Sequence, residues 1–217
     1  MREKISSSQK ALNLWAIILI VWSIYRIAFK LPEWFDEFIA KPLVFVFPVY
    51  YFIAKIDKKK FLTEIWIKPN KFRKDLFLSI GIIIFFIATA LLSNFIKYKK
   101  LILVRQTIGL SEVPLIILIV LATAVSEEIL SRGFVLKKLY DESKNIFTSS
   151  FFASILFFFL HVPILFTSKI TGSLLLTYII TDLLISLINS FVFIERKSLV
   201  LPILIHALYN LSMIFFI

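Results

Sequence analysis

Two adjacent carboxylates, Glu127 and Glu128, lie in the middle of a strongly apolar stretch, and Arg132 follows one helical turn later. At the centre of a membrane helix each such ionisable group costs roughly 2.5–3.5 kcal/mol. This cost indicates a functional site buried between helices, because apolar packing alone does not require charged groups. The alternative is a structural salt bridge that fixes the register of the helix. A buried carboxylate can act as a general base that activates water.

The only two histidines, His161 and His206, also lie in apolar segments. A single intramembrane histidine is more often a hydrogen-bonding group between helices, but two of them together with an acidic pair favour one polar cluster. Asn210 follows His206 by four residues and therefore shares its helix face. Taken alone, Asn210 favours an interhelical hydrogen bond. Together with His206, its amide could stabilise a developing oxyanion.

Helical geometry gives the two adjacent carboxylates different tasks, because neighbouring residues point about 100° apart on a helix. Glu128 precedes Arg132 by one turn, with the acid nearer the N-terminus, which is the favourable order for an ion pair. Glu127 is then left to face the histidines. Helix rise puts Glu127 about 20 Å and His161 about 24 Å from the turn between their helices, so the two side chains match in depth.

A catalytic zinc ion is the alternative to metal-free activation of water. Such an ion usually takes three protein ligands and keeps one position open. Glu127, His161 and His206 could supply three ligands, but the sequence has no His-Glu-x-x-His motif on one helix. We therefore expect no cofactor and assign no metal ligand, with Zn²⁺ held by these three residues as the alternative.

A third group of polar residues, Asp182, Ser186 and Ser190, recurs at intervals of one helical turn. Small residues on such a face let helices approach closely. We interpret this face first as a packing surface and second as part of a substrate channel.

The elements that position these side chains must be membrane helices. Of the 217 residues, 59% are hydrophobic, above the roughly 45–50% of a soluble domain. Backbone groups in hydrocarbon must be satisfied within each segment, so spans of this composition are helices. The sequence predicts an all-α, polytopic transmembrane helical bundle of about seven spans, with a range of roughly six to eight. The apolar segments are residues 11–29, 38–54, 76–96, 114–138, 146–161, 173–194 and 199–217, of which the second and fifth are short.

The net charge of +11 comes from basic residues that lie mostly between the apolar segments. The positive-inside rule and anionic lipid explain this placement, so we expect the lipid bilayer as a partner and exclude nucleic acid. More Lys and Arg fall on the side of the N-terminus, which predicts a cytoplasmic N-terminus. Lys41 counts among the outer residues, and the basic stretch Lys97 to Arg105 opposes this orientation. The chain has no cysteine, which excludes disulfides and a cysteine nucleophile.

Three motifs in order along the second half of the chain resemble the CPBP family of intramembrane proteases, which includes CAAX proteases and bacteriocin-processing proteins and is also called the Abi family. The motifs are Glu127-Glu128-x-x-x-Arg132, Phe157-x-x-x-His161 and His206-x-x-x-Asn210. The resemblance covers about residues 112–217, which we expect to form the catalytic transmembrane core. Residues 1–111 would supply N-terminal transmembrane helices and basic loops. One departure is that family members often have glycine at the positions of Ser186 and Ser190.

The resemblance implies an intramembrane endopeptidase of glutamate type or a metalloprotease. Its substrate would be a membrane-associated or lipidated peptide or protein; in the eukaryotic relatives it is a prenylated protein. The implied roles are activation of water by Glu127 and His161 and stabilisation of the oxyanion by His206 and Asn210. The residues implied to support the site are Glu128, Arg132 and Phe157.

Two other functions are compatible with these residues. One is a non-catalytic membrane scaffold or bacteriocin self-immunity protein of the same fold, although binding alone would not need the complete Glu, His, His and Asn set. The other is a proton-coupled transporter, in which buried acids and histidines form a proton relay. The sequence shows no internal repeat and no pair of broken helices, which opposes a transporter. We expect an integral protein of a bacterial cell membrane.

Overall fold

The computed structural model of the protein describes residues 5–67, 72–99, 109–169 and 171–216. Helices dominate these residues, and no strand occurs among them. The predicted all-α fold is therefore confirmed. Each of the seven predicted apolar segments, as far as it is described, coincides with a helix or with a run of consecutive helical turns.

The first two segments pack together as an N-terminal pair. α1 covers Ser7–Ala28 and follows Ser6, whose side chain accepts a hydrogen bond from the backbone N–H of Gln9 and so satisfies one free amide of the first turn. The second segment runs without interruption over Glu33–Ile56. It consists of α2 (Glu33–Phe35), the π-helical turns η1 (Asp36–Ala40) and η2 (Pro42–Val46), α3 (Phe47–Tyr51) and η3 (Phe52–Ile56).

Two prolines accompany the wide turns of the second segment. Pro42 and Pro48 lie inside it, and proline cannot donate the backbone hydrogen bond that an α-helix requires. π-helical turns are one way for a helix to continue past such a defect, and they occur frequently at functional sites.

A short connecting helix and two long elements follow. α4 covers Phe61–Glu64 and α5 covers Phe72–Tyr98. The next element extends over Val113–Ser143 and carries both adjacent carboxylates. It consists of α6 (Val113–Glu128), the π-helical stretch η5 (Ile129–Leu136) and α7 (Lys137–Ser143), so the helix changes its winding directly after Glu128.

The last three helices are α8 (Ile146–Thr167), α9 (Gly172–Arg196) and α10 (Val200–Phe216). α8 begins after Asn145, whose side chain accepts from the backbone N–H of Thr148. It continues past Pro163 without a break. The second and fifth predicted segments, expected to be short, are therefore wrong in length: their helices have 24 and 22 residues.

Five elements of the described chain are long and apolar enough to cross a membrane, and a shorter apolar helix covers Val200–Ile214. By length and composition this agrees with the predicted helical membrane bundle. The protein is an integral membrane protein. These six elements are fewer than the predicted count of about seven spans, which stays a prediction. Lys100 and Arg105 of the opposing basic stretch lie outside the described residues.

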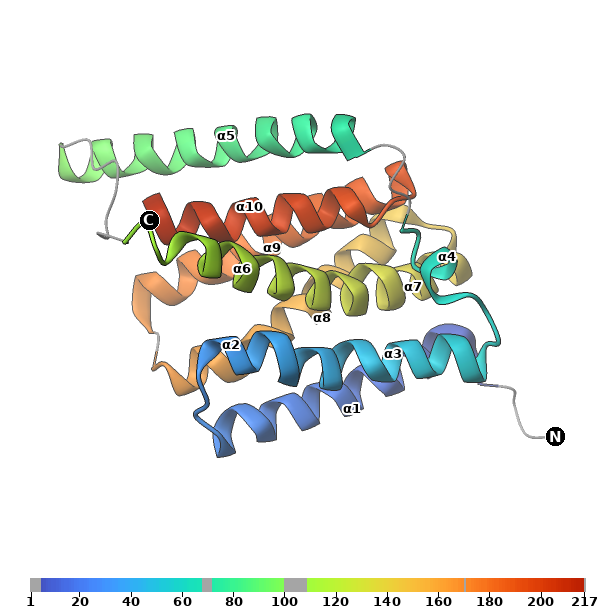
Figure 1. Ribbon diagram of the computed structural model, residues 1–217. Helices are drawn as coiled ribbons and strands as arrows, with labels where there is room; N and C mark the ends of the chain where they lie inside the picture. Colours follow the sequence, from blue (N-terminus) through green and yellow to red (C-terminus); the bar gives the residue numbers. More distant parts are fainter. Residues whose placement is uncertain (1–4, 68–71, 100–108, 170, 217) are drawn as a thin grey trace.

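Figure 1 shows how these helices are layered. α5 lies outermost and packs on α10, while α6, α8 and α9 form the middle of the bundle. α1 and the α2–α3 segment cover the opposite side, where α1 contacts α8 and α7. α1 begins at the end of the bundle that holds the α7–α8 turn, and α10 ends at the other. The acidic pair on α6 is therefore enclosed by helices from both halves of the chain.

A cluster of ion pairs closes the end of the bundle near α4 and α7. Glu64 lies between three ammonium groups, those of Lys59 at 2.8 Å, Lys138 at 3.4 Å and Lys137 at 3.5 Å. Lys138 also pairs with Asp57. Burial raises the pKa of Glu64, but the three ammonium groups outweigh burial and hold that pKa below its ordinary value.

Candidate active site

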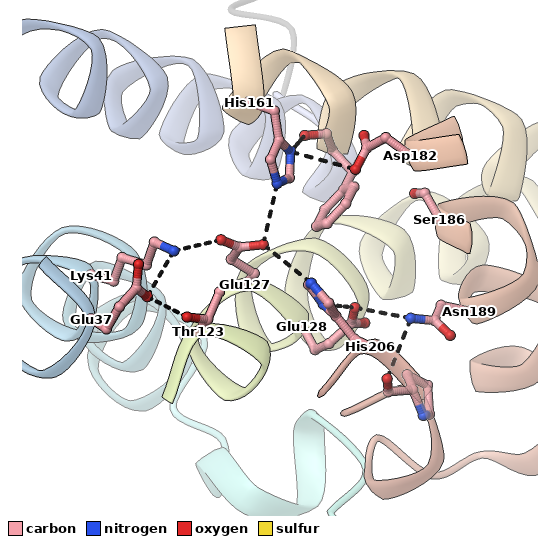
Figure 2. A network of polar contacts seen from close by, with 12 residues as sticks. Glu37, Lys41, Thr123, Glu127, Glu128, His161, Asp182, Ser186, Asn189 and His206 are labelled. Atoms are coloured by element: carbon pink, nitrogen blue, oxygen red, sulfur yellow. Dashed lines mark hydrogen bonds and ion pairs between the residues drawn. The ribbon is translucent and has the colours of Figure 1, made fainter. Parts of the chain in front are cut away.

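The carboxylate of Glu127 lies at the centre of a buried polar network that joins five helical segments (Figure 2). Its Oε1 accepts a hydrogen bond from Lys41 Nζ at 2.7 Å. Its Oε2 lies 3.6 Å from Nε2 of His161 and 3.7 Å from Nε2 of His206. The structure therefore brings together three of the four predicted catalytic side chains, with both imidazoles directed at one oxygen of one carboxylate.

Each histidine is oriented by an acceptor at its other ring nitrogen. Nδ1 of His206 lies 2.9 Å from Oε1 of Glu128. Nδ1 of His161 lies 3.3 Å from the backbone oxygen of Phe157 and 3.8 Å from Oδ1 of Asp182. An ionised carboxylate only accepts hydrogen bonds, so His206 donates through Nδ1.

Glu128 connects the other supporting residues. Its Oε1 accepts from Arg132 Nη1 at 3.0 Å and from Asn189 Nδ2 at 3.2 Å, in addition to His206. The predicted ion pair between Glu128 and Arg132 is therefore present, and the two carboxylates do have different tasks. Glu128 contacts Nδ1 of His206 and so orients its ring, whereas Glu127 faces Nε2 of both imidazoles.

Arg132 is completely surrounded by protein. Its side chain is 1% exposed, and Nη2 donates to the hydroxyl and the backbone oxygen of Ser186 at 2.6 and 3.0 Å. The guanidinium lies 4.2 Å from the ring centre of Phe157, within the range of a cation–π contact. The Phe157 ring in turn contacts the rings of His161 and His206, with centre distances of 4.8 and 5.7 Å. Phe157 thus packs between the cation and both imidazoles, as a supporting residue.

An open cavity of about 370 Å³ meets this network. Glu127, His161 and Asn210 are among its lining residues, whereas Glu128 and Arg132 are fully buried behind it. Asn210 lines the cavity one turn beyond His206, which is not itself among the lining residues. Most of the remaining lining is apolar or aromatic and includes Trp22, Phe158 and Met213. A site of this kind combines a few directed polar groups with a surface suited to apolar ligand groups.

The face formed by Asp182, Ser186 and Ser190 does more than pack. Ser186 accepts a hydrogen bond from Arg132, and Asp182 lines the cavity beside His161. Ser190 is buried without a hydrogen-bond partner among the described residues, which fits a packing position. The interpretation as packing surface thus holds for Ser190, while Asp182 and Ser186 belong to the polar network.

Sequence reasoning missed four residues of the network: Lys41, Glu37, Thr123 and Asn189. Lys41 was counted with the outer loops, which is wrong, because it is a helical residue between η1 and η2 and is only 7% exposed. The usable signal was its spacing from Glu37, since an acid and a base four residues apart within a helix can pair in the same way as Glu128 and Arg132. No comparable spacing in the sequence pointed to Asn189.

The donor atoms do not fit a zinc ion as they are placed. Among the residues that the structure describes, no group of three or more His, Asp or Glu side chains could hold a metal ion. The ammonium of Lys41 already holds Glu127 at 2.7 Å, and a second cation on the same carboxylate would be repelled by it. The alternative in which Glu127, His161 and His206 hold Zn²⁺ stays a prediction.

Comparison with known protein families supports the resemblance. The family model described as Rce1-like, type II CAAX prenyl endopeptidase Rce1-like, matches residues 109–212. No match was found among the curated proteins, and none among the solved structures. The matched segment includes Glu127, His161, His206 and Asn210, while Lys41 lies outside it. Residues 109–212 are thus similar to the Rce1-like domain of the type II CAAX prenyl endopeptidases, which is consistent with the CPBP family.

Proposed function

We propose that the protein is an intramembrane endopeptidase that hydrolyses a peptide bond with a water molecule activated by Glu127. The observation that carries the proposal is the position of Oε2 of Glu127. This oxygen is buried, has no hydrogen-bond partner within the described chain, and faces Nε2 of both His161 and His206 across less than 4 Å. The carboxylate also lines the cavity that would admit the substrate.

The reaction assigns a task to each group. Glu127 takes a proton from water while His161 orients it, and the water oxygen attacks the carbonyl carbon of the scissile bond. The resulting oxyanion accepts hydrogen bonds from the amide of Asn210 and from the ring of His206. The carbon–nitrogen bond then breaks, and the proton held by Glu127 passes to the leaving amine. One water is consumed, and a new carboxylic acid and a new amine are formed.

The substrate proposed is a membrane-associated peptide or protein. The cavity lies among helices that are apolar enough to span a membrane, and apolar side chains from α6, α8 and α10 line it. Such a lining suits apolar or lipid-linked segments of a substrate. The proposed reaction uses no metal ion. The ion pair of Lys41 with the carboxylate of Glu127 supports this, because it already supplies a positive charge beside that carboxylate.

The proposed location is a bacterial cell membrane with a cytoplasmic N-terminus. The positive-inside rule counts only basic residues in loops near the ends of spans. Lys41 is buried within the bundle and no longer counts against this orientation. Lys137 and Lys138, which count for the N-terminal side, are buried as well, so the balance of basic residues still favours that side to about the same degree.

The test compares the purified wild type with Glu127→Gln and His161→Gln in nanodiscs, using quenched fluorescent peptides with and without a prenyl group. Wild type should cleave at least one class of peptide. Both variants should lose cleavage by about 10²-fold or more, since general bases contribute on the order of 10²–10⁴-fold. Full cleavage by Glu127→Gln would overturn the proposal, and a phenotype that persists in this variant would favour the scaffold or immunity function.

A further inference from the structure

Two pairs of residues, each one helical turn apart, face one another across the contact between the second helical segment and α6. Glu37 and Lys41 project from the second helical segment, and Thr123 and Glu127 project from α6 (Figure 2). Thr123 Oγ1 donates to Glu37 Oε2 at 2.7 Å. Lys41 Nζ lies 2.8 Å from that same oxygen and 2.7 Å from Glu127 Oε1. The four side chains form one continuous chain of contacts.

These contacts matter for stability because the charged side chains that make them are buried. The exposed fractions of Glu37, Lys41 and Glu127 are 8%, 7% and 4%. A buried ammonium or carboxylate without a partner is strongly unfavourable. Lys41 provides the only ion pair between Glu127 and a permanently charged side chain in the described residues. Glu37 in turn holds Lys41 in place, because it accepts from Lys41 and is itself fixed by Thr123.

The geometry also decides which oxygen of Glu127 is free to react. The terminal torsion of a glutamate side chain is soft, so burial alone does not fix the plane of its carboxylate. Lys41 holds Oε1, and Oε2 is thereby directed at the two imidazoles. A carboxylate that rotated away from this orientation would no longer present its free oxygen next to His161.

We propose that Lys41, held by Glu37, is a positioning residue that fixes and neutralises the general base Glu127, so that the N-terminal half of the chain completes the catalytic site. This inference rests on the proposed peptidase function and extends it to residues outside the Rce1-like segment. Lys41 contacts the catalytic carboxylate through Oε1 and takes no part in proton transfer.

Two other roles for Lys41 predict different kinetics. A lysine that bound the substrate would affect KM, whereas a positioning residue affects kcat with little change in KM. A purely structural ion pair would lower stability and leave the turnover of the folded enzyme unchanged. The kinetic constants of folded, monodisperse protein therefore separate the three roles.

The test uses four variants in nanodiscs: Lys41→Met, Lys41→Arg, Glu37→Gln, and the double variant Lys41→Met with Glu37→Gln. The double variant removes one charge of each sign and so avoids leaving Glu37 as an additional buried anion. We expect its kcat to fall about 10–100-fold, as for other residues that orient a catalytic group, with KM changed by less than about threefold. Lys41→Arg should recover part of the lost kcat, because it keeps the cation, and Glu37→Gln should lose less than the double variant.

A matched control breaks a second ion pair with a buried carboxylate far from the site. Arg196 pairs with Asp75 at 2.9 Å, so Arg196→Met should lower thermal stability and leave kcat unchanged. An unchanged kcat in the double variant, or a change confined to KM, would overturn the inference. If the wild type cleaves no peptide, the proposed function fails. A thermal double-mutant cycle between Lys41→Met and Glu127→Gln then still decides whether the two side chains are coupled, and additive effects would contradict the pairing.

Discussion

The ammonium of Lys41 lies 2.7 Å from Oε1 of Glu127, although 86 residues separate the two in the chain. This contact joins the N-terminal helices to the Rce1-like segment at the carboxylate of Glu127, which is the proposed general base. The opposite oxygen of Glu127 faces the two histidines, so one carboxylate connects a fixed cation on one side to two ionisable rings on the other.

Arg132→Met should destabilise the protein strongly. The substitution leaves Glu128 in a fully buried position without its cation, and breaking such a pair typically costs about 3–5 kcal/mol. Thermal unfolding in detergent, followed by loss of monodisperse protein, measures the effect. Adding Glu128→Gln should restore much of the lost stability, because the buried anion is removed; an equally unstable double variant would contradict this explanation.

Asn189→Leu should lower peptide cleavage by about 10-fold or more, because Asn189 helps to hold the carboxylate that orients His206. Its amide also donates to the backbone oxygen of Pro202, which ties α9 to α10. The matched control is Ser190→Ala, a buried neighbour without a hydrogen-bond partner among the described residues. Cleavage by the control should stay at the wild-type rate, and equal losses in both variants would point to disturbed packing instead.

Asp182→Asn should reduce kcat by about 10–100-fold with little change in stability. The aspartate lies 3.8 Å from Nδ1 of His161 and helps to orient this ring. Steady-state kinetics of the folded variant measures the effect. Thr177→Val, one turn earlier on the same helix, removes a hydroxyl that bonds only within its own helix and should be neutral. Wild-type kcat in Asp182→Asn would exclude a role for Asp182 in the reaction.

The ion pairs of Glu64 predict a loss of stability in acid. Because the folded protein holds the pKa of Glu64 below its ordinary value, the ionised group stabilises the fold. This stabilisation is complete above the pKa of an unfolded glutamate, about 4.3, and is lost as the pH falls further through the lower folded-state pKa. The melting temperature of the wild type in detergent should therefore fall more steeply below about pH 4.3 than that of Glu64→Gln. Parallel curves for the two proteins would contradict the assignment.

Local sequence spacing was enough to predict much of the candidate active site. Glu128 and Arg132, like His206 and Asn210, lie one turn apart on single helices, so their common faces follow from helix geometry alone. The depth argument for Glu127 and His161 also succeeded, because a tight turn joins α7 to α8 and α8 runs as an uninterrupted helix.

The remaining part of the site depends on how distant helices pack, which no local spacing reveals. Lys41 was counted with the outer basic residues although it falls inside the predicted segment 38–54. The helix begins earlier than predicted, at Glu33, so Lys41 lies well inside it, directly before the π-helical turn that starts at Pro42. Asn189 reaches Glu128 only because α9 packs beside the π-helical stretch that follows the acidic pair. Both contacts require the relative rotation of two helices, and hydropathy does not determine it.

The most direct test of the central claim is cleavage of a quenched peptide library, including prenylated CAAX-type peptides, by wild type and Glu127→Gln, each with and without a metal chelator. The account predicts that the wild type cleaves in both conditions and that Glu127→Gln cleaves in neither. Cleavage by Glu127→Gln at the wild-type rate would contradict the role of Glu127. Wild-type cleavage that the chelator abolishes and zinc restores would contradict the metal-free reaction and would make His161 and His206 metal ligands.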